Sequence, residues 1–322
     1  MKEALNIIFL GTPDFAVDSL AALLQQGFHI SAVVTAPDQP AGRGQVMQSS
    51  PVKKYALQHG LKVLQPIKLK DPGFLRELSS FHADLFIVVA FRMLPEIVWQ
   101  MPRLGTFNLH ASLLPQYRGA APINHVIING ETETGLTTFF LKQEIDTGAI
   151  IFQEKMPIYP EDTAGELHDR MKTAGANLVL KTAEAISTGN LKTIEQRNLI
   201  EPSIPLKTAP KIFREDCRIE WTMNIDEVYN KIRGLSPYPA AFTYFTSPSG
   251  ESFLVKIYKT KKSVTRNHMQ PAVLITDGKS DLAVTTANGI LHIREIQQAG
   301  KRIMKIEEFL RGFRVNSDWN VG

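Results

Sequence analysis

Short apolar runs alternate with stretches of helical apolar spacing through the first half of the chain. Residues 5–10 form one apolar run, residues 15–26 carry apolar side chains at helical spacing, and residues 30–35 form a second run. Residues 83–90 read ADLFIVVA and are the most strongly apolar run. Apolar strands that alternate with helices are typical of a parallel sheet covered on both faces. This rhythm predicts an open, mostly parallel Rossmann-like α/β sheet.

The length of 322 residues exceeds the usual size of a single core, so we expect two domains. A long amphipathic helix at residues 163–187, capped by Asp162, ends the first of them. Residues 191–210 are polar and rich in proline, and we interpret them as a linker. Short strand-like stretches separated by glycine turns follow and predict a small β-barrel. The predicted division is therefore 1–190, a linker at 191–210, and 211–322.

The composition is that of an ordinary globular protein, with 43% hydrophobic and 21% charged residues. The first apolar run is too short for a signal peptide, and no later run reaches membrane-spanning length. The single cysteine, Cys217, excludes an internal disulfide framework, and no His or Cys cluster is present to hold a metal. A cytoplasmic enzyme without a metal is the simplest interpretation.

The positive charge is unevenly distributed along the chain. The net charge is +4, and the residues from Ala209 onward contain 17 Lys+Arg and 12 Asp+Glu. Their balance of +5 leaves −1 for the residues before Ala209. A basic C-terminal domain suits a polyanionic partner, although a solvated lysine-rich surface gives the same excess.

The most informative motif is LGTFNLHASLLPQYRGAAP at residues 104–122. Asn108 and His110 lie two residues apart on a predicted strand, so both side chains project from the same face. They fall at the carboxyl end of that strand, where ligands bind in open α/β sheets. A lone histidine beside a strand is more often structural, and Asp146 in the turn EIDTGAI is by itself a turn former. Taken together, the three residues indicate a catalytic site.

The combination of NLHASLLPQYRGAAP with DTG resembles the folate-dependent formyltransferases, whose pattern is Asn-x-His, Ser-Leu-Leu-Pro, Arg-Gly and a later Asp. GTPDFA, PAGRG and SPYPAAFTY extend the likeness over nearly the whole chain. The resemblance implies an OB-like C-terminal barrel that binds RNA. It implies transfer of the formyl group of 10-formyltetrahydrofolate to the amino group of methionyl initiator tRNA. We expect a monomer that does not bind a membrane.

The chemistry of formyl transfer gives each of the three residues a role. The neutral amide of Asn108 can donate a hydrogen bond to the oxyanion without titrating, and His110 can pass protons. The resemblance implies that Asp146 orients the imidazole. A covalent route is not supported, because Ser112 has no obvious base and Cys217 lies in the predicted second domain.

The resemblance also implies binding residues. The loop after residues 83–90 borders the pterin of the folate, and the segment after His110 forms a wall of the site. The predicted folate-binding residues are Phe91, Arg92, Met93, Leu94, Ser112, Leu113, Leu114 and Pro115. The family commonly has Ala-Tyr-Gly before Leu-Pro, whereas Ala90, Phe91 and Arg92 precede Met93 here.

A long polar loop is expected at residues 37–50, and the resemblance implies that it contacts the acceptor end of the tRNA through Arg43. Gln39 and Gln45 stand where basic residues are frequent in the family. Fewer phosphate contacts predict a weaker dependence of tRNA affinity on salt.

Other functions remain open at this point. A formyltransferase acting on an amino sugar nucleotide shares NLH, SLLP and DTG, and would be active without RNA. The ribotide formyltransferase normally ends after the catalytic domain, which the C-terminal domain argues against. A non-catalytic RNA-binding protein on the same fold would never show turnover. A nicotinamide-dependent oxidoreductase is disfavoured because GTPDFA is not the G-x-G-x-x-G fingerprint.

Overall fold

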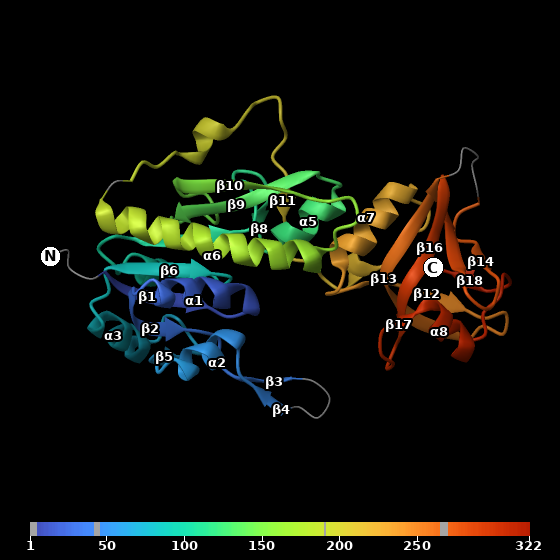
Figure 1. Ribbon diagram of the computed structural model, residues 1–322, viewed down its shortest axis with the longest axis horizontal. Helices are drawn as coiled ribbons and strands as arrows, with labels where there is room; N and C mark the ends of the chain where they lie inside the picture. The colour runs from blue at the N-terminus through green and yellow to red at the C-terminus, as the bar shows by residue number, and fades with distance from the viewer. Residues whose placement is uncertain (1–4, 42–45, 190, 265–269) are drawn as a thin grey trace. The chain divides into compact units, whose positions relative to one another are not determined.

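The computed structural model describes residues 5–41, 46–189, 191–264 and 270–322 (Figure 1). The chain divides into two compact units. The first comprises Met1–Gly119, Thr134–Met156 and His168–Thr208, and the second Ala120–Glu133, Pro157–Leu167 and Ala209–Gly322. The domain boundaries expected from the sequence stay a prediction. Among the described helices, none is both long enough and apolar enough to span a membrane.

A seven-stranded sheet with the order β10-β9-β7-β6-β1-β2-β5 forms the core of the first unit. Its strands are β1 (Asn6–Gly11), β2 (His29–Val34), β5 (Val63–Leu64), β6 (Leu85–Val89), β7 (Thr106–His110), β9 (Glu133–Phe140) and β10 (Ile150–Pro157). The strands from β5 to β7 in this order are parallel, and β9 is antiparallel to β7. The strand order reverses between β1 and β6. The open, mostly parallel Rossmann-like sheet predicted from the sequence is confirmed.

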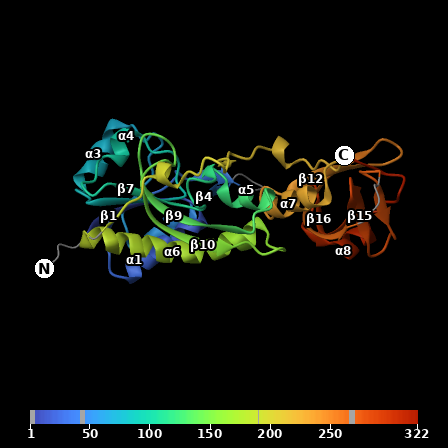
Figure 2. The same cartoon turned by 90° about the horizontal axis from the view of Figure 1, so that it is seen from above.

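Helices cover both faces of this sheet. They are α1 (Val17–Gln25), α2 (Pro51–Gln58), α3 (Pro72–Ser80), α4 (Glu96–Trp99) and α6 (Ala164–Thr188). Figure 2 shows α1 and α6 on one face and α3 and α4 on the other. Side chains at alternate positions of β1 and β6, such as Ile8 and Val88, pack with Phe74 and Leu78 of α3. The sheet is therefore buried on both sides, which explains its apolar strands.

The start of α6 differs from the expectation. The residue that caps α6 is Thr163, because its Oγ1 accepts from Glu166 N at 3.2 Å while Glu166 Oε2 accepts from Thr163 N at 2.8 Å. The prediction of Asp162 as the cap is wrong by one residue, since Asp162 Oδ2 accepts from Tyr159 N at 2.6 Å in the preceding turn.

The polar loop expected at residues 37–50 is in part a hairpin. Strands β3 (Gln39–Ala41) and β4 (Val46–Gln48) pair antiparallel within it. At its base, Asp38 accepts hydrogen bonds from Lys53 Nζ at 2.6 Å and Gln65 Nε2 at 2.9 Å. These contacts fix the start of the hairpin against the sheet, although the sequence shows only its Gly, Pro and Ser content. Arg43 lies outside the described residues.

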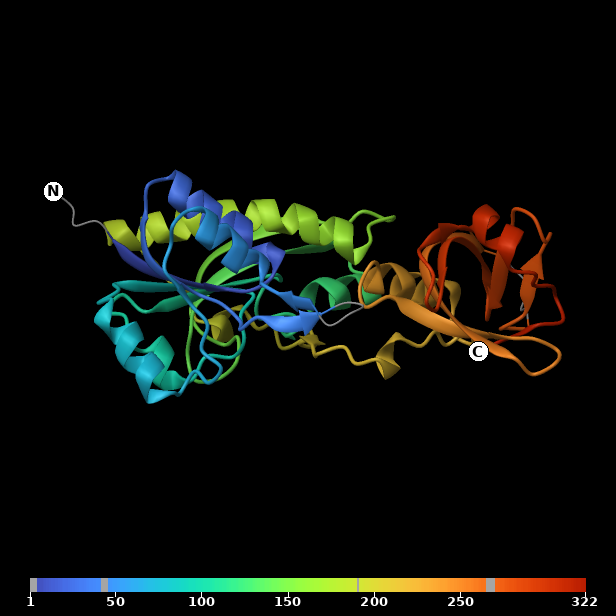
Figure 3. The same ribbon diagram turned by 90° about the horizontal axis from the view of Figure 1, so that it is seen from below.

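The second unit contains an antiparallel sheet with the order β14-β15-β16-β13-β12-β18, in which β17 also pairs with β16 (Figure 3). Its strands are β12 (Ala241–Thr246), β13 (Ser252–Val264), β14 (Leu274–Thr276), β15 (Leu282–Thr286), β16 (Gly289–Gln298), β17 (Met304–Lys305) and β18 (Asn320–Val321). A bridge between Val273 and Asn320 joins the two ends of the sheet. The result is a nearly closed barrel with Val255 and Ile293 buried inside it. The predicted small OB-like barrel is confirmed.

Three helices also belong to the second unit: α5 (Pro122–Ile128), α7 (Ile225–Leu235) and α8 (Ile306–Gly312). A capping box at Asn224 and Glu227 starts α7. Asn124 of α5 donates to the carbonyl of Gly234 at 2.7 Å. A Cβ atom at Gly234 would lie 2.6 Å from Ile128 Cγ1, so only glycine allows these helices to pack this closely.

The remaining elements are short and belong to connections. They are β8 (Arg118–Gly119), β11 (Thr208–Ala209), η1 (Asp14–Ala16), η2 (Gln196–Leu199) and η3 (Glu215–Cys217). Strand β8 pairs with β11. The segment after α6 therefore contains regular structure, although the sequence predicts only a linker there.

Candidate active site

Asn108 and His110 lie on β7, where Asn108 pairs with Val88 of β6 and Phe139 of β9, and His110 pairs with Thr137 of β9. Their spacing on the strand places both on one face, as predicted, and the structure shows that this is the face that α3 and α4 cover. The His110 side chain is only 6% exposed, and its ring meets the Phe139 ring edge-on at 6.4 Å. Within the described part of the chain, the Asn108 amide makes no hydrogen bond, so its N–H groups are available to a ligand.

The hydrogen bond between His110 Nε2 and the carbonyl oxygen of Tyr117, at 2.9 Å, fixes the tautomer of the imidazole. A carbonyl only accepts, so Nε2 must carry the hydrogen. The neutral ring then has its lone pair on Nδ1. Any proton that His110 exchanges with a substrate passes through Nδ1.

Asp146 faces that nitrogen. Its Oδ2 lies 3.9 Å from His110 Nδ1, and the same atom accepts a hydrogen bond from Gly119 N at 2.9 Å. The Asp146 side chain is 13% exposed. The carboxylate therefore faces the ring nitrogen through which His110 would exchange a proton. The structure thus brings together Asp146 and His110, which the sequence only suggested.

The turn that carries Asp146 has an unusual backbone. Asp146 has a φ of +53°, in the left-handed region that costs most L-residues roughly 1–2 kcal/mol. A Cβ atom at Gly148 would lie 1.6 Å from the carbonyl oxygen of Phe140, so this position accepts only glycine. The D-T-G motif is therefore needed for a tight turn as well as for its carboxylate.

Gln196 holds this turn and is a residue that the sequence analysis missed. It is 2% exposed, and its Nε2 donates to the carbonyls of Asp146 at 2.8 Å and Gly148 at 2.9 Å. Its Oε1 accepts from Arg118 Nε at 3.1 Å and Nη2 at 2.6 Å. Burial lowers the pKa of the Arg118 guanidinium, and the carboxylates of Asp146 and Glu144 oppose that shift. No sequence motif distinguishes Gln196 from other linker residues.

The segment predicted as a wall of the folate site is tightly packed. Ser112, Leu114 and Pro115 are buried, and Leu113 is half-buried. Ser112 Oγ donates to Gln116 O at 2.6 Å, so the hydroxyl supports the loop. Thr137 Oγ1 donates to Ser112 O at 2.7 Å and accepts from Leu114 N at 3.2 Å. The predicted role of these residues in folate binding stays a prediction.

The four predicted residues after β6 also lie together. Arg92 donates to the carbonyls of Ile67, at 2.9 Å, and Pro66, so it joins the loops that follow β5 and β6. Phe91 is half-buried beneath the guanidinium, and Leu94 is packed in the core below. Met93 is 73% exposed. This loop stands at the carboxyl end of β6, as expected, and its contact with ligand stays a prediction.

Further exposed apolar side chains occur around these loops. Ile67 is 80% exposed after β5, and Ile145 is 57% exposed beside Asp146. Like Met93, each is an exposed apolar side chain in a loop that follows a strand of the sheet. The sequence analysis missed Ile67 and Ile145, because a single isoleucine in a loop carries no periodic signal.

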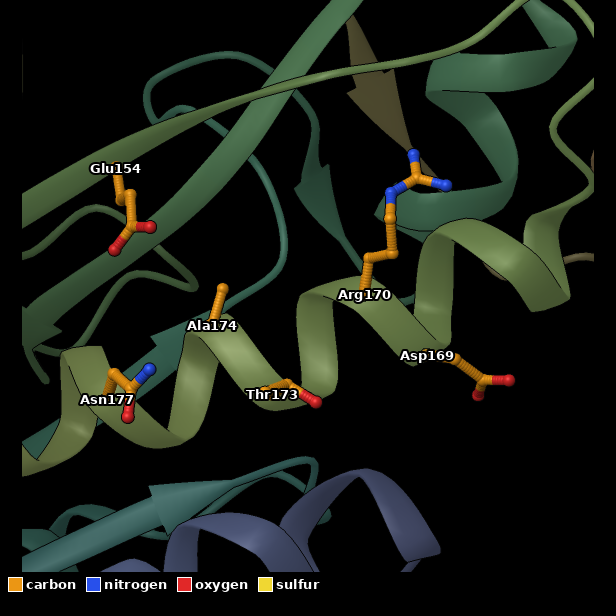
Figure 4. A pocket seen from close by; sticks show the side chains of 6 residues that line it. All are labelled: Glu154, Asp169, Arg170, Thr173, Ala174 and Asn177. Carbon is orange, nitrogen blue, oxygen red and sulfur yellow. The ribbon is translucent and has the colours of Figure 1, made fainter.

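A depression of about 550 Å³ lies elsewhere in the first unit, between α6 and β10 (Figure 4). It is lined by Glu154, Asp169, Arg170, Thr173, Ala174 and Asn177. A Cβ at Gly175 would lie 2.7 Å from Leu109 Cδ2, so α6 covers the face of the sheet opposite Asn108. The depression is separate from the predicted site residues.

Among the residues that the structure describes, no group of His, Cys, Asp and Glu is arranged to hold a metal ion.

Comparison with known proteins covers nearly the whole chain. Residues 5–183 match a family model described as formyl transferase, and residues 211–314 match the model described as formyl transferase, C-terminal domain. The chain is 52% identical over 320 residues to methionyl-tRNA formyltransferase of Bacteroides fragilis, which covers 99% of this chain and 98% of that protein. It is 51% identical over 322 residues to methionyl-tRNA formyltransferase of Parabacteroides distasonis, which covers 100% and 99%.

Among solved structures, the sugar 3N-formyl transferase WlaRD is similar with a TM-score of 0.65. The similarity covers 93% of this chain and 100% of that chain, at 22% identity. At this level of identity, the likeness concerns the fold alone.

Proposed function

The chain belongs to the formyl transferase family, and from this premise we propose that it transfers the formyl group of 10-formyltetrahydrofolate to the free amino group of methionyl initiator tRNA. The observation that carries the proposal is the distance of 3.9 Å between His110 Nδ1 and Asp146 Oδ2. His110 lies two residues along β7 from Asn108, whose amide is on the same face of the strand. The two relatives named above are methionyl-tRNA formyltransferases, and about half of their residues are identical to this chain over nearly their full length. This similarity supports the choice of acceptor.

The first task of the site is to stabilise an oxyanion. The amine nitrogen forms a bond to the formyl carbon, and the carbonyl oxygen gains negative charge before the bond to the folate nitrogen breaks. Asn108 supplies N–H donors that have no partner among the described residues. One well-placed donor of this kind lowers the barrier by about 3 kcal/mol.

The second task is proton exchange. The attacking amine loses a proton, and the leaving folate nitrogen gains one. His110 takes up the amine proton at Nδ1, because Nε2 already donates to Tyr117 O. Asp146 stabilises the imidazolium that results. The same proton then passes to the leaving nitrogen, so the enzyme ends the reaction in its starting protonation state.

The first unit supplies the residues for folate binding, and both units supply residues for tRNA binding. The exposed apolar side chains of Ile67, Met93 and Ile145 suit the flat ring system of a folate. The balance of +5 from Ala209 onward, together with Arg43, suits the phosphate backbone of a tRNA. A monomeric state and a cytoplasmic location stay predictions from the sequence.

The proposal is tested by mixing the protein with 10-formyltetrahydrofolate and one of three acceptors: methionyl initiator tRNA, uncharged initiator tRNA, or an amino sugar nucleotide. We expect formylation of the charged tRNA alone, since only it presents the methionyl amine. Formylation of the sugar nucleotide but not of the charged tRNA would assign the chain to the sugar enzymes. RNA binding without any turnover would identify a non-catalytic protein.

A further inference from the structure

Gln196 uses the full hydrogen-bonding capacity of its amide. Two N–H donors of Nε2 go to the carbonyls of Asp146 and Gly148, and Oε1 accepts twice from Arg118. Gly148, Asp146 and Arg118 lie 48, 50 and 78 residues away in sequence. A residue that only connects two parts of the chain does not require four side-chain hydrogen bonds to distant residues. A side chain that is 2% exposed also has no surface on which to touch a substrate.

The segment around Gln196 is fixed to the first unit on both sides. Ile194 and Ile150 form a bridge, with N–O distances of 2.8 and 2.9 Å. Figure 1 shows this segment, in yellow, passing beside β10. Further along, Lys207 N donates to Gln116 Oε1 at 2.8 Å. The amide of Gln196 is therefore held at a fixed position and does not follow its partners passively.

The contacts of Gln196 converge on the atoms that place Asp146. The Asp146 backbone is left-handed, and its carboxylate is attached to Gly119, the neighbour of Arg118. Gln196 thus contacts both sides of the Asp146–Gly119 hydrogen bond. It bonds to the backbone carbonyl of Asp146 on one side and to the guanidinium of Arg118, the neighbour of Gly119, on the other. Without Gln196, the Asp146 and Gly148 carbonyls lose the N–H donors that hold the turn in its unfavourable φ.

We propose that Gln196 is a positioning residue for formyl transfer, which holds the Asp146–Gly148 turn so that the Asp146 carboxylate faces His110 Nδ1. This inference rests on the proposed function, because it assigns the residue a part in that reaction. Gln196 acts through Asp146 and Arg118 and not by contact with a reacting atom.

Two substitutions distinguish the role of the Gln196 N–H donors from the role of its oxygen acceptor. Gln196→Met has a similar size and removes all four hydrogen bonds. Gln196→Glu keeps an acceptor for Arg118 but replaces the donors to the Asp146 and Gly148 carbonyls with a charged oxygen, which repels them. If the Asp146 turn is what matters, both variants lower kcat by about 30-fold or more while KM for each substrate changes by less than about 3-fold. If only the Arg118 contact matters, Gln196→Glu retains activity, and the proposal is wrong.

A double-mutant cycle tests the route of the effect. Asp146→Asn keeps an oxygen for Gly119 N and removes the charge. If Gln196 acts through Asp146, adding Gln196→Met to Asp146→Asn lowers kcat by less than about 2-fold further. Losses that multiply would show that Gln196 supports the fold independently. Thr182→Val on α6 is the matched control, because it removes buried hydrogen bonds to Thr138 of β9 and to the Leu178 carbonyl of α6. We expect its kcat to stay within about 2-fold of wild type.

A crystal structure of Gln196→Met decides the inference independently of the acceptor substrate. We expect the Asp146 backbone to leave the left-handed region and its carboxylate to move away from His110. An unchanged turn would overturn the inference even if the enzyme formylates tRNA. Conversely, wild-type protein that formylates no charged tRNA would refute the proposed function, while the crystal structure would still test the role of Gln196.

Discussion

The carboxylate oxygen Oδ2 of Asp146 accepts a hydrogen bond from Gly119 N at 2.9 Å, across 27 residues of sequence. The same atom faces His110 Nδ1 at 3.9 Å. One oxygen therefore fixes the loop after Arg118 and orients toward the imidazole, which a carboxylate oxygen with two lone pairs can do at once. The geometry of the candidate site therefore depends on how the loops that carry Gly119 and Asp146 are held.

Thr137 is hydrogen-bonded to the segment predicted as a wall of the folate site, so its substitution should affect folate binding if that prediction holds. Thr137→Val leaves the Ser112 carbonyl and the Leu114 N–H without this partner, at a cost of roughly 1–3 kcal/mol. We expect KM for 10-formyltetrahydrofolate to rise about 10-fold with a smaller change in kcat. Steady-state kinetics check this, with Thr137→Ser as the variant that keeps the hydroxyl. An unchanged KM in Thr137→Val would show that the wall does not bind folate.

Gly148→Ala should disturb the Asp146 turn, because the added Cβ would lie 1.6 Å from Phe140 O. We expect the free energy of unfolding to fall by about 2–4 kcal/mol and turnover to fall with it. Urea denaturation and a formylation assay measure the two effects. Gly27→Ala provides the control, since its Cβ meets nothing within 4 Å and only its φ of +81° is unfavourable. A Gly148→Ala protein as stable as Gly27→Ala would contradict the predicted clash.

The affinity for initiator tRNA should depend on salt through Arg43. Arg43→Ala should weaken binding and reduce the slope of log K against log salt by about 1, the value for one phosphate contact. Fluorescence titrations at several salt concentrations give the slope. Arg103→Ala is the control, because this guanidinium pairs with Asp84 before the amino end of β6. The same change of slope in both variants would mean that Arg43 acts only through net charge.

Asp277 should make the barrel stability dependent on pH. Hydrogen bonds from the Ser280 hydroxyl and from the N–H groups of Asp281, Ser280 and Lys279 hold the pKa of Asp277 below its ordinary value of 3.8. A lowered pKa adds stability above the unfolded-state value, and this stability is lost as pH falls through the folded-state value. Asp277→Ala should therefore be less stable than wild type near neutral pH.

Denaturation of both proteins at a series of pH values tests this. The difference in free energy of unfolding should shrink as pH falls below about 4, where the unfolded chain takes up the proton. A difference that grows with acidity would have the wrong sign for a lowered pKa.

Much of the fold could be predicted, because parallel strands buried on both faces have a continuous apolar signal. The long helix expected at 163–187 is α6 (Ala164–Thr188), since its apolar spacing extends over many turns. The short strands β3 and β4 could not be predicted, because each is only three residues long and their pairing depends on contacts at Asp38. The cap of α6 was placed one residue early because Asp162 and Thr163 are both good capping residues.

In the candidate site, too, some features could be predicted from the sequence and others could not. Asn108 and His110 could be predicted as neighbours because two residues on one strand share a face. The approach of Asp146 could only be suggested by the resemblance, since it depends on a turn held by Gln196. Tyr117 acts through its carbonyl, and a backbone atom leaves no trace in residue identity.

The central claim is that Asn108, His110 and Asp146 act in the transfer step and not in substrate binding. The most direct measurement is single-turnover formylation of methionyl initiator tRNA by Asn108→Ala, His110→Ala and Asp146→Ala, with the tRNA Kd measured separately. We predict that each variant loses about 100-fold or more in the transfer rate, while its Kd stays within about 3-fold of wild type. Equal losses in rate and affinity would contradict the claim and identify these residues as parts of a binding scaffold.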